Sequence, residues 1–328
     1  MMSSENPTHF SASCSRPARS VLCVGAAVLD TLFRVHSLPT GQGKILPYDM
    51  LQVAEGMASS AAFAIARLGG NASLWGAVGD DATGERIIAD LSNSGIDTSG
   101  MAHVAGARSA VSTILVDDQG ERLIVPFYDA GLHEMVKPVT KQDVSAFDAV
   151  LVDVRWPKLA LRTLLAAREA GRPGVLDGDV AGDGVIEMLA PSASHIVFSQ
   201  PAAERLTGAA EPPKAVGLLK RKFEHAFISV TSGEDGSFWF DERAGEIFHL
   251  AAPKVRAVDT LAAGDIFHGA FALAVAEGMP IAETMRLSSM AAALKCQVFG
   301  GRIGAPTRAE VYDGLRGWDA AVARTIDR

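Results

Sequence analysis

The residues best suited to chemistry lie in the stretch Asp259-Thr260-Leu261-Ala262-Ala263-Gly264-Asp265, which opens a strongly helical run from Ile266 to Glu277. Small residues at a helix start leave the first backbone N–H groups accessible, and these groups and the helix dipole favour an anion such as phosphate. Asp265 would repel that anion, so it needs another purpose, such as accepting a proton from an attacking hydroxyl. The spacing alone also allows a structural role, in which Asp265 only complements the helix dipole. As a base it needs no raised pKa, because an ordinary carboxylate is already ionised at neutral pH.

Other nucleotide and metal motifs are incomplete in this chain. Gly41-Gln42-Gly43-Lys44 resembles the end of a P-loop, but Ile45 replaces the required Ser or Thr and Leu38 replaces the first glycine. The sequence has no G-x-G-x-x-G after the first predicted strand, no H-E-x-x-H and no C-x-x-C, so we do not expect a catalytic metal held by protein ligands. Phe238 to Phe240 indicate a packed strand rather than a platform for stacking bases.

Short apolar runs alternate with helical patterns along most of the chain. This alternation predicts a doubly wound, mostly parallel sheet with helices on both faces, whose ligands lie beyond the carboxyl ends of the strands. The predicted strands are Val21–Val28, Ala72–Val78, Ala146–Val154, Arg172–Leu176, His195–Phe198 and Ala226–Val230, and the predicted helices include Ala58–Leu68, Asp81–Ser94, 158–170 and 202–207.

Two stretches break the alternation. Residues 109 to 128 read as a β-hairpin around the turn Asp117-Asp118-Gln119-Gly120, and residues 31 to 53 read as extended chain. Together they predict a small projecting sheet. The sequence leaves open whether this sheet is a lid over the active site or a decorated edge of the main sheet.

Composition excludes several classes of protein. The chain has 328 residues, of which 48% are hydrophobic, and a net charge of -8, which argues against a nucleic-acid surface. Its apolar runs are too short to cross a membrane, which takes about 20 residues. Three widely spaced cysteines suggest reduced thiols and a cytoplasmic location. Residues 1–18 are expected to form a flexible tail before one domain spanning 19–328. The run after Arg16 and Arg19 imitates a signal peptide but is better explained as a buried strand.

The stretch from Asp259 to Asp265 resembles the C-terminal signature of the PfkB, or ribokinase-like, carbohydrate kinases, usually written D-T-x-G-A-G-D. Further landmarks of this family appear in order between residues 21 and 311. They are Asp30 after the first strand, Gly56 before Ser60, the helix end at Arg67-Leu68-Gly69, Val78-Gly79-Asp80-Asp81 with Gly84, the T-x-G-x-x-G loop of Thr231, Gly233 and Gly236, and Ala291 to Gly301 with Pro306.

The resemblance implies a ribokinase-like fold with a β-sheet lid, and ATP-dependent phosphorylation of a sugar hydroxyl with Mg²⁺ bridging the phosphates. It makes Asp265 the catalytic base. It further implies an anion hole at Ala262, Ala263 and Gly264, an acceptor site at Asp30, Lys44, Gly56, Ser60 and Arg155, and a nucleotide site at Ser199, Thr231, Gly233, Gly236 and Ser289. In this family lid sheets often pair between subunits, which implies a homodimer; no nucleic-acid or membrane partner is expected.

Within the family the chain is most similar to the sulfofructose kinases. The similar stretches are Val152 to Trp156, Leu176 to Asp179, Ala293 to Cys296 and Gly300 to Arg302. In that subgroup a Lys, an Asn and an Arg gather the sulfonate; Lys44 and Arg155 match two of them, and Pro126 stands at the Asn position. Lys44 and Arg155 could equally be surface cations.

The chain departs from the family pattern at three places. Ala262 replaces the signature's first glycine, Glu55 replaces one of two glycines before the first helix, and Ser199 to Ala202 replaces an N-x-x-E motif. Ala262 is expected to be tolerated if its φ angle is negative. The departures keep three alternatives open: a kinase for a neutral ketose or pentose, a nucleoside kinase, or a binding protein with weakened catalysis.

Overall fold

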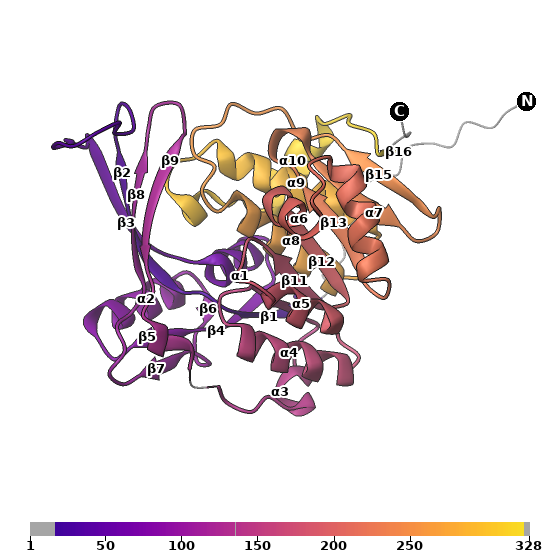
Figure 1. Cartoon of the computed structure of the whole chain (residues 1–328), viewed down its shortest axis with the longest axis horizontal. Helices are drawn as coiled ribbons and strands as arrows, with labels where there is room; N and C mark the ends of the chain where they lie inside the picture. Colours follow the sequence, from indigo (N-terminus) through magenta and orange to yellow (C-terminus); the bar gives the residue numbers. More distant parts are fainter. Residues whose placement is uncertain (1–16, 135, 325–328) are drawn as a thin grey trace, which may run out of the picture.

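A mostly parallel sheet lies at the centre of the computed structural model, which describes residues 17–134 and 136–324 (Figure 1). Within these residues it has ten strands, in the order β16-β15-β14-β13-β12-β11-β10-β1-β4-β6. The strands from β13 to β6 run parallel, and β14, β15 and β16 extend one edge antiparallel. Their bounds are β1 Ser20–Val24, β4 Asn71–Trp75, β6 Ile96–Asp97, β10 Ala149–Val152, β11 Gly174–Gly178, β12 His195–Ser199, β13 Phe227–Thr231, β14 Ser237–Asp241, β15 Glu246–Leu250 and β16 Ala323–Arg324.

Helices cover both faces of this sheet because successive strand residues point to opposite sides. Val21 and Cys23 of β1 belong to one buried cluster, and Leu22 and Val24 belong to the other. The first cluster includes side chains of α1 Met57–Arg67, α2 Ala82–Asn93, α8 Ala263–Ala276, α9 Ile281–Cys296 and α10 Arg308–Arg316. The second includes side chains of α3 Lys141–Ser145, α4 Pro157–Glu169, α5 Val185–Leu189, α6 Gln200–Thr207 and α7 Pro212–Lys222. The predicted doubly wound arrangement is confirmed.

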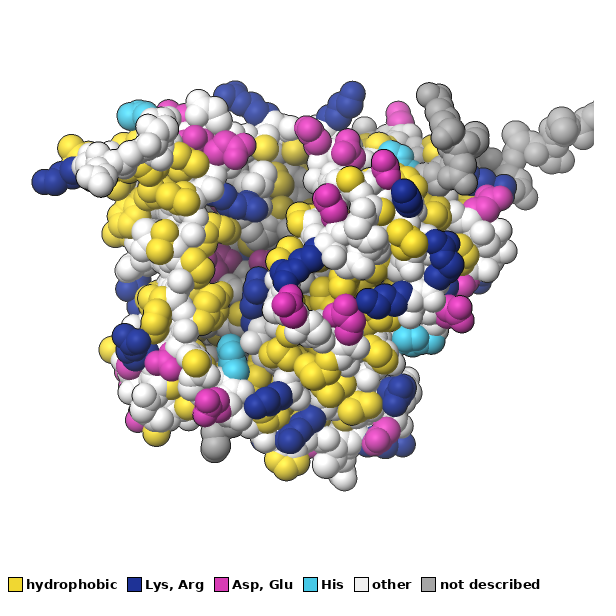
Figure 2. Space-filling model, in the orientation of Figure 1, with side chains coloured by type: hydrophobic (Ala, Val, Ile, Leu, Met, Phe, Trp, Pro, Cys, Tyr) yellow, Lys and Arg dark blue, Asp and Glu magenta, His cyan; other side chains and the backbone are white. Residues whose placement is uncertain are grey.

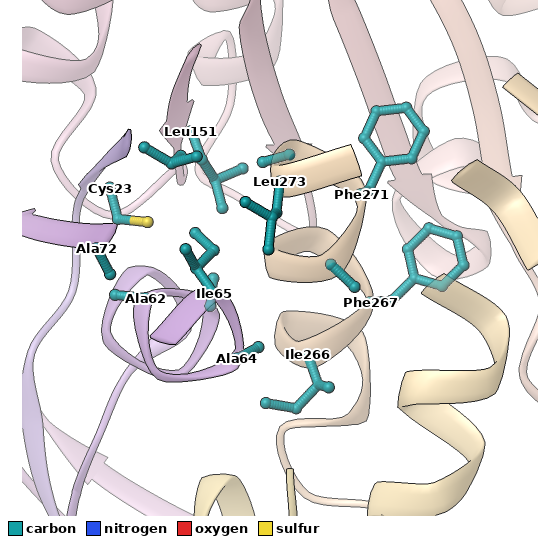
Figure 3. Close-up of a cluster of buried hydrophobic side chains, with 14 of the residues drawn as sticks. Cys23, Ala62, Ala64, Ile65, Ala72, Leu151, Ile266, Phe267, Phe271 and Leu273 are labelled. Carbon is teal, nitrogen blue, oxygen red and sulfur yellow. The ribbon is translucent and has the colours of Figure 1, made fainter. Parts of the chain in front are cut away.

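The packing of α8 fixes where its first turn lies. Phe267, Phe271 and Leu273 of α8 are buried, and Leu273 faces Ile65 of α1 (Figure 3). Each such side chain contributes roughly 1.5–3 kcal/mol when it leaves water. At Gly269 the two helices approach so closely that a Cβ atom would lie 2.3 Å from the carbonyl oxygen of Ala61. The start of α8 is therefore held by a rigid, buried helix.

A four-stranded sheet in the order β3-β2-β8-β9 stands apart from the main sheet and forms the predicted lid (Figure 1). Its strands are β2 Val28–Arg34, β3 Asp49–Glu55, β8 Val111–Val116 and β9 Arg122–Phe127. Leu32, Val53, Ile114 and Val116 form its small core, against which Leu261 and Phe299 of the body pack. The turn of the β8–β9 hairpin thus lies near the segment that leads into α8.

Two predicted strands are wrong in extent, because each is divided at a glycine. The run predicted as Val21–Val28 ends in the main sheet at Val24, and the chain then enters the lid at Val28. At Gly25, between them, a Cβ atom would lie 2.1 Å from the carboxyl of Asp153. The run predicted as Ala72–Val78 is divided at Gly76 into β4 and the short β5 Ala77–Gly79, which pairs with β7 Ala102–Val104.

The chain ends are only partly described. Of the predicted tail, residues 1–16 lie outside the described residues, and Pro17 and Ala18 are exposed. No helix in the described part of the chain is both long and apolar enough to cross a membrane.

Candidate active site

The candidate site lies where four strands end below the lid. The carboxyl ends of β10, β11, β12 and β13 are neighbours in the sheet. Asp153 follows β10, Asp179 follows β11, and Ser199 and Thr231 are the last residues of β12 and β13. The surface is hollowed between lid and body, with acidic side chains in its depth and basic side chains on its edge (Figure 2). This is the crevice in which ligands of such sheets bind.

The first turn of α8 offers free backbone donors at this crevice. Among the described residues, no acceptor is bonded to the N–H groups of Gly264 and Asp265. A Cβ atom built on Gly264 would meet nothing within 4 Å, so a phosphoryl group has room to approach the backbone.

Ala262 adopts a conformation that the sequence interpretation did not expect. Its φ angle is +61°, and it is the one non-glycine residue in the described ranges with a positive φ. The condition under which alanine was expected to be tolerated here, a negative φ angle, is therefore not met. Alanine in this left-handed region costs about 1–2 kcal/mol, and glycine avoids that cost.

Asp265 is surrounded by other acids. Burial raises its pKa well above the ordinary range, and the negative charge of Asp177 raises it further, followed by smaller contributions from Asp179 and Asp153. The pKa of Asp177, which is 2% exposed, is raised by burial and by Asp179. A base with an ordinary pKa is therefore not what the unliganded site presents.

His268 is the one positive influence on Asp265 within this group. Its Nδ1 lies 2.7 Å from the Gly264 carbonyl oxygen and 3.3 Å from Oδ2 of Asp177, and its Nε2 lies 3.1 Å from the Val197 carbonyl oxygen. Because both carbonyls can only accept, both ring nitrogens satisfy them only in the imidazolium form. A charged His268 would lower the pKa of Asp265 and offset part of the acidic crowding.

Asp30 faces the crevice from the lid. It is 7% exposed, accepts a 2.6 Å hydrogen bond from Ser112 Oγ, and has a pKa raised to about 6, mainly by burial. Ser112 pairs across the lid with Pro126, so Pro126 lies on the same row as Asp30. A buried carboxylate with one satisfied oxygen is suited to accepting a hydrogen bond from an acceptor hydroxyl.

Glu55 is a residue of this region whose role the sequence did not reveal. It is 3% exposed; its Oε2 accepts a 2.5 Å hydrogen bond from Ser60 Oγ, and its Oε1 accepts a 2.6 Å bond from the Arg302 N–H. Burial and then the charge of Asp30 raise its pKa to about 8, so it is mostly protonated at neutral pH. Predicted Gly56 lies beside it, and a Cβ atom there would be 2.4 Å from the Ala26 carbonyl oxygen.

Tyr128, at the end of β9, is another residue that the sequence interpretation missed. Burial raises its pKa, Arg155 lowers it, and Asp30, Asp153 and Asp265 raise it in turn. Charged residues of the lid, the sheet and α8 thus act on its hydroxyl, although the residue is 44% exposed. No motif marks it, because its neighbours come together only in the fold.

Lys44 and Arg155 are not joined in this structure. The Arg155 guanidinium lies 3.8 Å from Oδ2 of Asp179, and its backbone N–H donates to Asp153. Lys44 is exposed on the loop between β2 and β3 and has no hydrogen-bond or ion-pair partner among the described residues. Arg155 therefore lies at the strand ends, whereas Lys44 lies on a loop of the lid.

Four of the five predicted nucleotide residues lie at or just after the ends of β12 and β13, two neighbouring strands. Ser199 pairs in register with Thr231, and its hydroxyl donates to Asp179 at 2.8 Å. Gly233 and Gly236 have φ angles of +51° and +93° around a short 3₁₀ turn, Gly233–Asp235. Ser289 is buried in α9, which packs against α8.

Metal ligands are not clustered in the described ranges. No group of three or more His, Cys, Asp or Glu side chains there could hold a metal ion.

Comparison with known proteins places these features in a family. The family model described as pfkB family carbohydrate kinase matches residues 18–308. The chain is 27% identical over 310 residues to a ribokinase from Lactococcus lactis, which covers 90% of this chain and 97% of that protein. It is 30% identical over 262 residues to an ATP-dependent ribose-1-phosphate kinase from Halopiger xanaduensis, with 76% and 83% covered.

A solved structure gives the same result for the fold. The crystal structure of a provisionally assigned ribokinase from Agrobacterium tumefaciens superposes with a TM-score of 0.90 and 60% sequence identity. The match covers 92% of this chain and 98% of that one. The likeness confirms the predicted ribokinase-like fold, including its separate small sheet.

Proposed function

The chain belongs to the pfkB family of carbohydrate kinases, and we propose that it transfers the γ-phosphoryl group of ATP to a primary hydroxyl of a sugar, with Asp265 as the base. The observation that carries this proposal is the meeting of two features in one crevice. Free N–H groups at the start of α8 can hold the transferring group, and Asp265 lies in the same turn. Bound ATP would bring Mg²⁺, which neutralises phosphate charge during the transfer.

The protein's own groups would divide the work as follows. The N–H groups of Gly264 and Asp265 bind the oxygens of the γ-phosphoryl group, and the turn from Thr231 to Gly236 lies against the nucleotide. Asp30 orients the sugar by accepting a hydrogen bond from one of its hydroxyls. Asp265 takes the proton of the attacking hydroxyl late in the reaction, because an alcohol is a poor acid until its bond to phosphorus forms.

A neutral pentose or ketose is the acceptor that the site supports best. The Lactococcus lactis relative is named for ribose, a neutral pentose, whereas the Halopiger xanaduensis relative is named for an anionic sugar, ribose-1-phosphate. The buried acids Asp30 and Glu55 present oxygens suited to sugar hydroxyls. Sulfofructose or another anionic sugar is the second candidate, supported by Arg155 at the strand ends. Against it, the Arg155 guanidinium already faces Asp179, and Pro126 supplies no side-chain donor.

The acceptor can be identified by measuring ATP consumption over ribose, fructose, ribose-1-phosphate and sulfofructose. We expect turnover on a neutral sugar. If an anionic sugar is preferred instead, Arg155→Ala should weaken it far more than a neutral sugar, because arginine is suited to binding oxyanions. Equal losses on anionic and neutral sugars would contradict a role for Arg155 in binding an anionic group of the sugar. No ATP consumption on any sugar, together with no rise in melting temperature at millimolar ADP and Mg²⁺, would contradict a kinase.

Asp265→Asn tests the chemistry itself. The change keeps the side chain's size and removes its basicity, so kcat on the best sugar should fall by about 10²- to 10⁴-fold. ATP affinity should persist or rise, because a charge that repels phosphate is lost. Asp148→Asn is the matched control, since the Asp148 carboxyl bonds Arg19 and the Ser20 N–H at the amino end of β1, whereas the crevice lies at the carboxyl ends of the strands. Near-normal turnover in Asp265→Asn would show that another group is the base.

A further inference from the structure

Lys295 is a fully buried cation that the proposed reaction does not use. It lies in the last turn of α9, and its side chain is 0% exposed. Its Nζ donates to the backbone carbonyl oxygen of Asp259 at 2.7 Å and lies 3.0 Å from Oδ2 of the same residue. Removing an ammonium group from water costs several kcal/mol, and the two acceptors that Asp259 supplies offset that cost.

Asp259 is the first residue of the stretch Asp259 to Asp265, which contains the proposed anion hole. Its Oδ1 accepts the Leu261 N–H at 2.8 Å, and its Oδ2 accepts the N–H groups of Gly300 and Gly301 at 3.0 and 2.9 Å. Its backbone N–H donates to the Cys296 carbonyl oxygen at 3.1 Å. One carboxylate therefore joins the segment before α8 to the loop after α9. Burial alone would raise its pKa, but Lys295 and these N–H groups outweigh that effect and lower it.

Arg302, the next residue of the same loop, is bonded to Glu55 at the end of the lid strand β3. The Arg302 N–H donates to Glu55, which also bonds Ser60 in the acceptor region. Gly300, Gly301 and Arg302 thus give three successive N–H groups to two buried carboxyl side chains. The loop connects the start of α8 to the acceptor side, and its geometry depends on Asp259 remaining ionised and in place.

We propose that Lys295 is a positioning residue that acts as a fixed internal cation for the anion hole, holding Asp259 ionised and offsetting its charge. This inference rests on the proposed kinase function. Without Lys295, a buried negative charge would lie within a few residues of the N–H groups that bind phosphate, and it would oppose the incoming anion. Asp259 would then take up a proton or turn away, releasing the Leu261, Gly300 and Gly301 N–H groups. A fixed ammonium also leaves wild-type turnover independent of which monovalent cation is dissolved in the buffer.

The experiment compares Lys295→Met, which keeps the length of the side chain without its charge, with Lys295→Ala, which leaves a cavity beside Asp259. Turnover is measured at constant ionic strength in sodium, potassium, ammonium, methylammonium or tetramethylammonium chloride. We expect kcat to fall by about 10²-fold in both variants, the loss typical of a weakened oxyanion site. Ammonium or methylammonium should raise the kcat of Lys295→Ala by at least about tenfold, because only these small cations both fit the cavity and donate hydrogen bonds. Wild type should be indifferent to the salt.

Lys220→Met is the matched control. Lys220 is also largely buried and donates to two carbonyl oxygens and to Glu242, but it lies on α7, away from the crevice. Its removal should leave kcat and the salt response unchanged. A lysine with a merely structural role at position 295 would behave like this control in kcat, whatever its effect on stability.

A second readout does not need turnover. Hydrogen exchange measured by mass spectrometry should show faster exchange in the segment 298–304 of Lys295→Met than in wild type. Faster exchange there would support the proposal even if the acceptor sugar has been misidentified. A failure of this proposal can therefore be distinguished from a failure of the proposed function.

Normal kcat in Lys295→Met with unchanged protection of this segment overturns the proposal, as does a Lys295→Ala variant that no small cation restores. If Lys295→Met does not fold, the double variant Lys295→Met/Asp259→Asn decides, because it buries no unpaired charge. It should fold and show the same low kcat, whereas normal kcat in it would overturn the proposal.

Discussion

Acidic side chains crowd the end of β11 and the start of α8, and this crowding sets the protonation state of the proposed base. Asp177, with an unpartnered Oδ1 in the described structure, has the largest charge effect on the pKa of Asp265. Two carboxylates that interact strongly lose their protons in two steps that belong to the pair. The acid limb of kcat/KM should therefore lie at a higher pH than an ordinary aspartate would give.

Asp177→Asn tests this coupling. The amide keeps a hydrogen-bond acceptor for His268 but removes the negative charge that raises the pKa of Asp265, so the pKa of Asp265 should fall. The acid limb of kcat/KM should then move to lower pH by about one unit or more, because like charges in one site commonly shift a pKa by that much. The measurement is the pH profile of kcat/KM from pH 4 to 9, with Asp148→Asn as the unshifted control. An unmoved or raised acid limb would contradict the coupling.

At the same scale, some site residues could be predicted from sequence and others could not. Asp265 was predictable because the small residues and the acid are neighbours in one helix turn. Glu55, Tyr128 and Lys295 were not, because their partners are distant in sequence; Arg302, for instance, lies 247 residues from Glu55. Asp259, the acid that precedes the helix, is a buried partner of Lys295, so Asp259→Asn cannot serve as a neutral control for Asp265→Asn.

At the scale of elements, the main difficulty was where a strand leaves its sheet. Apolar runs at Val21–Val28 and Ala72–Val78 predicted one strand each, since periodicity does not show that the chain passes from body to lid. The turn at Gly25 is required by the Asp153 carboxyl, which bonds the Ala26 and Ala58 N–H groups and so fixes the entry to β2 and α1. Helix boundaries were predicted more closely because capping residues and glycines mark them locally, as at Asp81 before α2.

The start of α8 supplies a prediction at this scale. Ala262 caps the helix in a left-handed conformation, where glycine would avoid a cost of about 1–2 kcal/mol. Ala262→Gly also makes the unfolded chain more flexible, which returns about 0.4–1 kcal/mol of that gain. We expect the free energy of unfolding to rise by roughly 0.5–1 kcal/mol, measured by urea unfolding with an unchanged m-value.

The control for this change is Ala263→Gly, one residue further into the same helix. Ala263 lacks the positive φ angle, so glycine there should lower stability by about 0.5–1 kcal/mol. If both substitutions destabilise the protein equally, the left-handed conformation of Ala262 carries no strain. Turnover of Ala262→Gly should stay within about threefold of wild type, since the N–H groups that bind phosphate begin after this residue.

For the whole molecule, the lid has two unlike faces. The row Asp30, Ser112 and Pro126 lies on the face that carries the site, as does the row Leu32, Ile114 and Ile124 that packs toward the body. By alternation, the other face carries Met50, Phe33, Leu115, Leu123 and Val125. Of these, Leu123 is 43% and Val125 61% exposed, and Figure 2 shows hydrophobic side chains gathered over the lid.

A large exposed apolar face often marks an interaction surface, and β9 is an edge strand that pairs only with β8 in the described structure. We therefore predict that two copies of the chain associate through their lids. Val125→Glu places a charge in the centre of that face and should convert a dimer into a monomer, as measured by sedimentation at micromolar concentration. Met188→Glu is the control, because Met188 is similarly exposed on α5, far along the chain from any lid strand. A wild-type chain that sediments as a monomer, or a Val125→Glu variant that remains dimeric, would contradict the prediction.

If the dimer also holds the lid in position, Val125→Glu should raise the KM for the sugar more than the KM for ATP, since Asp30 lies on the lid whereas Thr231 and Gly236 lie on the body.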